Sequence, residues 1–175
     1  MIIGLAGFAQ SGKDTLAKIL IEEHGFTKIA FADTIRVALY TLNPIVNEDG
    51  LRLQSLVDVE GWEIAKLTPE VRRLLQVFGT EVGRSLLGDQ VWVELAMRKL
   101  AESGNFVFTD VRFISEADAI RERNGFIWRI NREGVEPMNN HSSETELLEY
   151  FYDAIVDNNR SIEELREEVE FLLKK

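Results

Sequence analysis

The residues best suited to chemistry in this chain form the stretch GFAQSGKDT, which runs from Gly7 to Thr15. It fits the pattern G-x-x-x-x-G-K, with a short apolar segment before it and a helical pattern after it. Glycine lets the backbone curl so that successive N–H groups point at phosphate oxygens, and a helix amino terminus adds positive charge. Lys13 would supply a cation for the β- and γ-phosphates of a nucleotide. We predict a phosphate-binding loop, the alternative being a strand–helix turn whose glycines occur by chance.

The residue after Lys13 departs from the usual pattern. A Ser or Thr commonly holds Mg²⁺ there, whereas this chain has Asp14 followed by Thr15. We expect Asp14 to hold Mg²⁺ directly or through water, and Thr15 to donate to an α-phosphate oxygen. The change disfavours a switch-type GTPase, and the sequence also lacks an N-K-x-D guanine-reading motif.

Two acidic residues are predicted at the carboxyl ends of strands, where open α/β sheets bind their ligands. Asp33 would end the second strand, and Asp110 would end the third after an apolar run. We expect Asp110 to hold Mg²⁺ through water, and Asp33 to orient or accept from the attacking oxygen. The alternative for each is a helix cap, which is compatible with function.

Arginines should converge on a site where two phosphorylated reactants meet, because phosphoryl transfer needs charge compensation and alignment. The candidates are Arg36, Arg84, Arg112, Arg129 and Arg132. For each of them, the alternative is an ordinary solvated arginine.

Two further features are open to two interpretations. Residues 131–146 are polar, lack apolar periodicity and include His141, so they form either a lid that closes over the phosphates or an ordinary loop. Trp92 lies in a helical stretch, where an indole packs in the core more often than it stacks on a base.

The elements that must position these residues follow from short apolar segments that alternate with helical patterns. Strands are predicted at 1–6, 27–32, 105–109, 126–130 and 154–156. Helices are predicted at 14–24, 34–42, 69–78, 91–103, 115–124 and 161–174, the last opening with a Ser161-x-x-Glu164 capping box. This alternation predicts an α/β fold with about five mostly parallel strands and helices on both faces.

Composition limits the remaining possibilities. The 175 residues are 45% hydrophobic, which suits a single domain, and the net charge of −10 disfavours binding to polymeric nucleic acid. There is no cysteine for disulfides or thiolate metal sites, and there are only two histidines. We see no signal peptide and no apolar run long enough for a membrane span, so we expect a cytoplasmic protein.

Seven segments in order along the chain carry a family resemblance: SGKDT (11–15), FADTIR (31–36), LLQVFGTEVGR (74–84), DQVWV (89–93), TDVRF (109–113), HSSETEL (141–147) and IVDNN (155–159). Together they resemble the deoxynucleoside monophosphate kinases of bacteriophages. The resemblance implies a P-loop kinase three-layer sandwich with an acceptor-binding helical insert at 45–104 and a lid at 131–147. The core would comprise residues 1–44, 105–130 and 148–175.

The resemblance also implies a reaction, in which the γ-phosphate of ATP passes with Mg²⁺ to a deoxynucleoside monophosphate, giving dNDP and ADP. The catalytic residues would be Lys13, Asp33 and Arg112. ATP would be bound by Gly7, Gln10, Ser11, Gly12, Lys13, Asp14, Thr15 and Asn158, the last from a loop that packs against adenine. The acceptor would be bound by Asp33, Arg36, Thr80, Glu81, Arg84 and Trp92. The lid would contribute Arg129, Arg132 and His141, and Mg²⁺ would be held by Asp14 and Asp110.

Family members often carry Pro-Leu-Lys where this chain has Thr34-Ile35-Arg36, so the positive charge at position 36 is kept. We expect a monomer or homodimer, in the host cytoplasm if the chain is phage-encoded. Dephospho-coenzyme A kinase, or another small-molecule P-loop kinase, is the nearest alternative, and the GTEVGR segment argues against it. A P-loop ATP-binding regulatory module without kinase activity is a further alternative.

Overall fold

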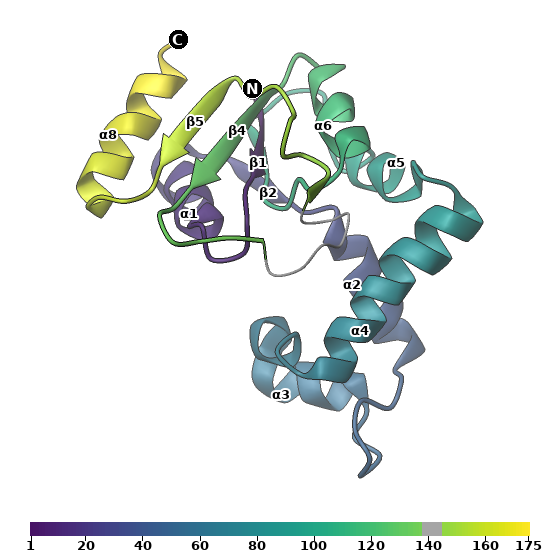
Figure 1. The fold of residues 1–175 in the computed structure, drawn as a ribbon. Coiled ribbons are helices and arrows are strands. Elements are labelled where there is room, and N and C mark those ends of the chain that lie inside the picture. The colour runs from purple at the N-terminus through teal and green to yellow at the C-terminus, as the bar shows by residue number, and fades with distance from the viewer. Residues whose placement is uncertain (138–144) are drawn as a thin grey trace. The chain divides into compact units, whose positions relative to one another are not determined.

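The computed structural model describes residues 1–137 and 145–175, and these form two compact units (Figure 1). We call Met1–Ala30 with Arg98–Lys175 the sheet unit, and Phe31–Met97 the helical unit. The boundaries of the predicted insert and lid stay a prediction. None of the helices in these described ranges has the length and apolarity needed to cross a membrane.

A five-stranded parallel sheet, in the order β2-β3-β1-β4-β5, forms the centre of the sheet unit. The strands are β1 (Ile2–Ala6), β2 (Thr27–Ile29), β3 (Phe106–Phe108), β4 (Phe126–Asn131) and β5 (Ala154–Asp157). Ile3 pairs with Val107 of β3 on one side and with Phe126 of β4 on the other. The predicted α/β class with parallel strands is confirmed.

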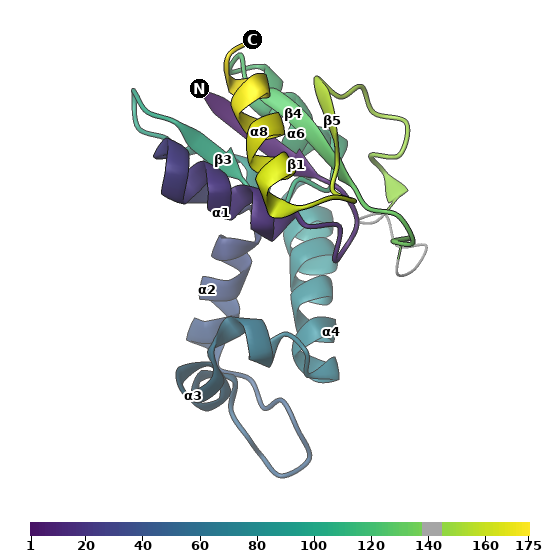
Figure 2. The same cartoon turned by 90° about the vertical axis from the view of Figure 1, so that its left-hand side faces the viewer.

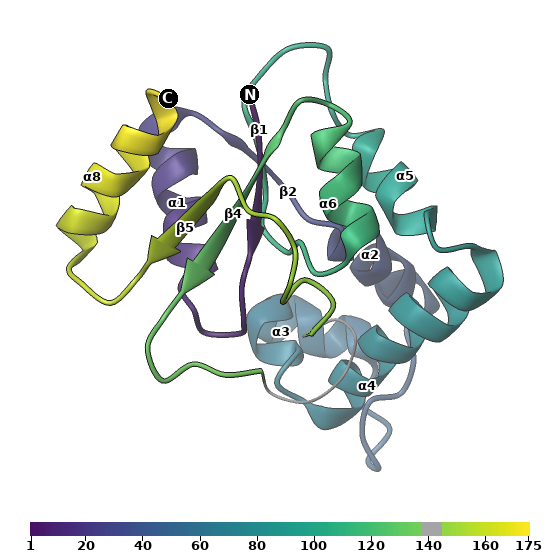
Figure 3. The same ribbon diagram turned by 45° about the horizontal axis from the view of Figure 1, so that its top comes forward.

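Helices cover both faces of this sheet. Helices α1 (Lys13–His24) and α8 (Ile162–Leu173) lie on one face, and α6 (Ile114–Arg121) lies on the other (Figures 1 and 3). Side-chain alternation along β1 explains both contacts. Ile3 and Leu5 point into the apolar cluster under α1 and α8, whereas a Cβ on Gly4 would lie only 2.7 Å from Ile120 Cδ1 of α6.

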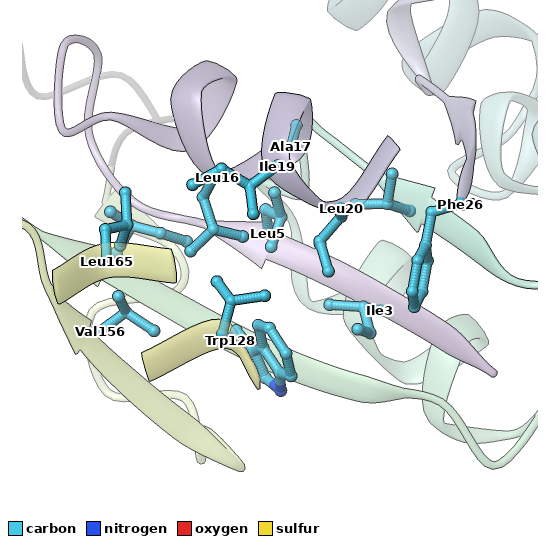
Figure 4. Close-up of a cluster of buried hydrophobic side chains, with 13 residues drawn as sticks. Ile3, Leu5, Leu16, Ala17, Ile19, Leu20, Phe26, Trp128, Val156 and Leu165 are labelled. Carbon is cyan, nitrogen blue, oxygen red and sulfur yellow. The ribbon is translucent and has the colours of Figure 1, made fainter. Parts of the chain in front are cut away.

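The apolar cluster beneath α1 and α8 is the main core of the sheet unit. Figure 4 shows Leu16 and Leu20 of α1 together with Trp128, Val156 and Leu165. Helix α8 is fixed at its start by the predicted capping box, because Ser161 Oγ accepts from the Glu164 amide and Glu164 Oε2 accepts from the Ser161 amide. Donation from the Ser161 amide and hydroxyl to the Glu164 carboxylate lowers the pKa of Glu164.

The chain that enters β5 is held to α6 and β4 by a polar network. The Arg121 guanidinium donates to Asp153 Oδ2 at 2.9 Å, and the Ile127 amide donates to the same oxygen at 2.7 Å. Arg121 Nε also donates to the Tyr150 hydroxyl at 3.1 Å, and that hydroxyl donates to Asp118 Oδ1, earlier in α6, at 2.8 Å. Arg121, a residue that the sequence analysis did not single out, therefore fixes the course of residues 150–153.

The helical unit has its own apolar cluster, formed by Leu39, Val46, Leu53 and Val71. Its elements are α2 (Ala32–Leu42), α3 (Leu53–Ala65), α4 (Pro69–Val77), the π-helix η1 (Phe78–Leu87) and α5 (Val91–Met97). Figure 2 shows α2 and α4 alongside each other with α3 next to them. Helix α3 is interrupted at Gly61, whose φ of 75° is not helical.

The structure corrects three predicted boundaries, one of which is the end of the helix predicted at 115–124, since α6 ends at Arg121. The second strand ends at Ile29, because Ala32 already starts α2, so Asp33 lies in the first turn of a helix and not at the end of a strand. The helix predicted at 91–103 ends at Met97.

Replacing Leu20 by Ala should lower the free energy of unfolding by about 2–5 kcal/mol, because a fully buried leucine leaves a cavity when it is truncated. Lys18→Ala is the matched control on the same helix, since the Lys18 side chain is 69% exposed, and it should change stability by no more than about 0.5 kcal/mol. Chemical denaturation of both variants measures the difference. Equal losses would contradict the assigned core face of α1.

Candidate functional site

The stretch Gly7–Thr15 connects β1 to α1 and curls as a phosphate-binding loop would. Gly7 has φ of 141° and Gly12 has φ of 102°, values that side-chain-bearing residues rarely adopt. A Cβ at Gly7 would lie 2.5 Å from the carbonyl oxygen of Ile130, at the end of β4. Glycine is therefore required at Gly7 by its backbone conformation and by the close approach of the neighbouring strand.

The Lys13 side chain folds back over this loop. Its ammonium group donates to the carbonyl oxygens of Gly7 at 2.8 Å and Phe8 at 2.7 Å. The Ser11 side chain is 1% exposed, and its hydroxyl has no hydrogen-bond partner among the described residues. A buried hydroxyl without a protein partner commonly bonds to an ordered water or an ion, and an anion held in this loop would supply such a partner.

Asn158, from the loop between β5 and α8, touches the same stretch. Its side-chain amide donates to the Ser11 carbonyl oxygen at 2.9 Å. A Cβ at Gly12 would lie 1.9 Å from that amide nitrogen. The structure thus brings Asn158 to the predicted ATP-binding residues, through a contact with the loop backbone.

Arg129 is a residue of β4, so it belongs to the sheet and not to the segment predicted as a lid. Its guanidinium carbon lies 5.4 Å from the centre of the Phe8 ring and 5.3 Å from that of the Tyr152 ring. Its Nε donates to Asn131 Oδ1 at 2.9 Å. Burial raises the pKa of Tyr152, and the charge of Arg129 opposes that shift. Arg129 therefore supports the loop through Phe8.

Sequence reasoning missed the three contacts of Arg129, which are with Phe8, Asn131 and Tyr152. Phe8 occupies an unspecified position of the loop pattern, and the other two are distant in sequence. Arg112, which was predicted, lines the same small hollow as Gly7, Phe8 and Arg129.

A cavity of about 290 Å³ opens beside the loop. It is lined by Thr15, Arg132, Glu133, Asn158, Asn159, Arg160, Ile162 and Leu165. The Glu133 amide donates to Asn159 Oδ1 at 2.7 Å, which joins the two loops that form its wall. This volume is close to the lower end of the usual range for small-molecule sites, and the position of the cavity next to the loop suits the nucleoside part of ATP.

Asp14 and Asp110 are the predicted metal ligands. Asp14 is exposed in the first turn of α1, and Asp110 is half-buried beyond β3. The Val111 amide donates to the Leu5 carbonyl oxygen at 3.2 Å, which holds this part of the chain beside the end of β1. Within the described ranges, no three acidic or histidine side chains gather as a metal cage. Mg²⁺ commonly takes one or two carboxylates together with phosphate oxygens and water, so a site that draws on Asp14 or Asp110 needs no such cage.

The remaining predicted residues lie in the helical unit. On α2, Arg36 Nη1 lies 3.5 Å from Asp33 Oδ1. On η1, Arg84 Nη1 donates to the Asp89 carbonyl oxygen at 3.0 Å, and Thr80 and Glu81 lie on the same helix. A π-helix is uncommon and is often found at functional sites.

Trp92 is buried in the helical unit, with 4% exposure. Its indole N–H donates to the Gly79 carbonyl oxygen at 2.7 Å, and a Cβ at Gly83 would lie 2.3 Å from the ring. These contacts favour the packing alternative over base stacking for Trp92. They also explain the glycine at position 83, one residue before Arg84.

The predicted residues thus fall into two sets, one in each unit. The sheet unit brings together the loop, Arg112, Arg129 and Asn158, with Arg132 at the neighbouring cavity. The helical unit contains Asp33, Arg36, Thr80, Glu81, Arg84 and Trp92. His141 lies outside the described residues.

Comparison with known proteins gives a consistent result. A family model described as deoxynucleotide monophosphate kinase matches residues 57–169, more than half of the chain. A protein of Acanthamoeba polyphaga mimivirus, provisionally named a deoxynucleotide monophosphate kinase, is 32% identical over 97% of this chain and 94% of its own length. The deoxynucleotide monophosphate kinase of Escherichia phage RB69 is 30% identical over an aligned region that covers 61% of this chain and 46% of that protein.

Among solved structures, a shikimate kinase from Aquifex aeolicus aligns with 99% of this chain and 96% of its own, at 16% identity and a TM-score of 0.49, a likeness too weak to argue from. The family match and the mimivirus relative carry the assignment. The chain belongs to the deoxynucleotide monophosphate kinase family.

Proposed function

We propose that this chain transfers the γ-phosphate of ATP to a deoxynucleoside monophosphate, giving a deoxynucleoside diphosphate and ADP. The observation that carries the proposal is the curled loop Gly7–Thr15, with the Lys13 ammonium folded over it. Membership of the family supports a mononucleotide as acceptor, in preference to dephospho-coenzyme A.

On the donor side, the loop amides and the amino terminus of α1 bind the triphosphate. Lys13 neutralises charge on the β- and γ-phosphates, and Arg112 adds a second cation beside Gly7 and Phe8. Mg²⁺ supplies further charge neutralisation when it is bound with ATP, and Asp14 and Asp110 would hold it directly or through water. The cavity lined by Arg132 and Asn159 takes the nucleoside.

On the acceptor side, Arg36 and Arg84 hold the phosphate of the mononucleotide. Arg36 is paired with Asp33, and the incoming phosphate competes for the same guanidinium group. An acceptor phosphate oxygen forms a bond to the γ-phosphorus while the bond from that phosphorus to the bridging oxygen of ADP breaks. The attacking oxygen is largely ionised at pH 7, because the second pKa of a phosphate monoester is about 6. Asp33 therefore orients Arg36 and does not need to remove a proton.

Lys13→Ala should lower kcat by a factor of about 10²–10³, because the loss of one preorganised donor to the developing charge typically costs that much. Lys18→Ala, on the outer face of the same helix, is the control and should keep normal kcat. A coupled assay of ADP release measures both, with melting temperature as the test of folding. Near-normal turnover by a folded Lys13→Ala variant would sink the assignment.

The acceptor class is tested by ADP release with the common dNMPs, the NMPs and dephospho-coenzyme A. We expect turnover with at least one dNMP, because the family is defined by that acceptor. Release with dephospho-coenzyme A alone would contradict the proposal. ATP binding without turnover of any acceptor would favour a regulatory module instead.

Arg36→Ala and Arg84→Ala should each raise KM for the dNMP by about 10- to 100-fold, because a hydrogen bond to a charged group contributes about 1.5–3 kcal/mol. KM for ATP should change much less. Arg73→Ala, an exposed arginine paired with Glu70 on α4, is the control from the same unit. Equal changes in KM for both substrates would argue against an acceptor-binding role.

A further inference from the structure

We propose that Asn158 is a positioning residue, which fixes the phosphate loop through the peptide between Ser11 and Gly12. The family resemblance implies a role for Asn158 near adenine, and Asn158 does line the cavity beside the loop. The hydrogen bond of its side-chain amide, however, is to the loop backbone. The inference rests on the proposed function only in requiring that Gly7–Thr15 bind a triphosphate.

The end of the β4–β5 ladder holds Asn158 in place for this contact. Asn131 and Asp157 form the last pair of the β4–β5 ladder, and the Asn158 amide donates to the Asn131 carbonyl oxygen at 2.8 Å. The Asn158 side chain therefore extends from a fixed point of the sheet. Its amide nitrogen faces Ser11, because a carbonyl oxygen can only accept a hydrogen bond.

The consequence for the loop follows from peptide geometry. In a planar trans peptide, the C=O and the N–H point in opposite directions. Anchoring the Ser11 carbonyl oxygen on Asn158 therefore directs the Gly12 N–H away from Asn158. That direction fixes one of the donors that a curled loop offers to an anion.

Glycine at position 12 makes this anchor necessary. Gly12 has φ of 102°, so it is in a region where glycine readily adopts more than one conformation. The peptide that precedes a glycine can rotate at low cost, and this rotation would turn the N–H away from the anion. The amide of Asn158 lies so close to Gly12 that a Cβ there would be 1.9 Å away. Only glycine therefore fits at position 12 while the Asn158 side chain is in this place.

The test uses substitutions that remove the donor of the Asn158 side chain. Asn158→Leu and Asn158→Ala should each weaken the affinity for ATP–Mg²⁺ by about tenfold or more, since a buried carbonyl loses its partner and the Gly12 amide loses its orientation, and neither change adds a charge beside the triphosphate. Calorimetric titration with ATP–Mg²⁺ in the absence of acceptor measures this affinity. KM for the dNMP should stay within about twofold, because the change acts on the donor side alone.

Arg166→Ala is the matched control, because Arg166 of α8 pairs with Glu23 of α1 at 2.8 Å without touching the loop. This variant loosens the contact between α8 and α1, the helices that follow the two loops, and should bind ATP normally. If Asn158→Leu folds poorly, Asn158→Ala, which removes the donor without adding bulk or charge, carries the test. Normal ATP affinity in a folded Asn158 variant, or a loss no larger than that of Arg166→Ala, would overturn the inference.

The calorimetric measurement separates this inference from the proposed function. If the wild-type chain binds ATP but phosphorylates no dNMP, the proposed acceptor is wrong while the effect of Asn158 on ATP affinity is still measured. If the wild-type chain does not bind ATP–Mg²⁺, both the loop assignment and the role of Asn158 fail.

Discussion

The loop backbone passes through positive φ three times, at Gly7, Gln10 and Gly12, and the proposed donor site depends on this constraint. The curl exists because β1 ends and α1 begins within a few residues, so the chain has to reverse tightly. A neighbouring group also leaves no room for a side chain at either glycine. This group is the Ile130 carbonyl at Gly7 and the Asn158 amide at Gly12. Sheet order provides both neighbours, because β4 pairs with β1 and β5 pairs with β4.

The charge distribution follows from the same arrangement. The chain carries a net charge of −10, yet Lys13, Arg112 and Arg129 gather at the carboxyl edge of the sheet next to the loop. A few focused cations can hold a small polyanion locally although the whole protein repels a long one. Arg129 shows that these cations differ in role, since it stacks between two rings while Lys13 lies on the loop itself.

Much of this could be predicted from the sequence, and what could not has identifiable physical reasons. The loop pattern and the buried strands have strong local signals, and so does the Ser161–Glu164 capping box. The second strand was extended too far because Phe31 and Ala32 continue an apolar run, which a helix start can share. The π-helix η1 could not be foreseen, since no simple apolar period distinguishes it from an α-helix. The contacts of Asn158 with Ser11 and of Arg129 with Phe8 join distant parts of the chain, so only the fold reveals them.

The two sets of residues differ in how they are prepared for their substrates. In the sheet unit, Lys13 and Asn158 already hydrogen-bond the loop backbone, so ATP would meet donors that are largely ordered, and the entropic cost of binding is reduced. In the helical unit, the Arg36 and Asp33 side chains are 26% and 38% exposed and lie 3.5 Å apart. An ion pair this exposed contributes only about 0–1 kcal/mol, less than a hydrogen bond between arginine and a phosphate, which contributes about 1.5–3 kcal/mol. In the proposed reaction, the acceptor phosphate would therefore displace Asp33 from Arg36 at little cost, and the carboxylate would hold the guanidinium in place until the acceptor arrives.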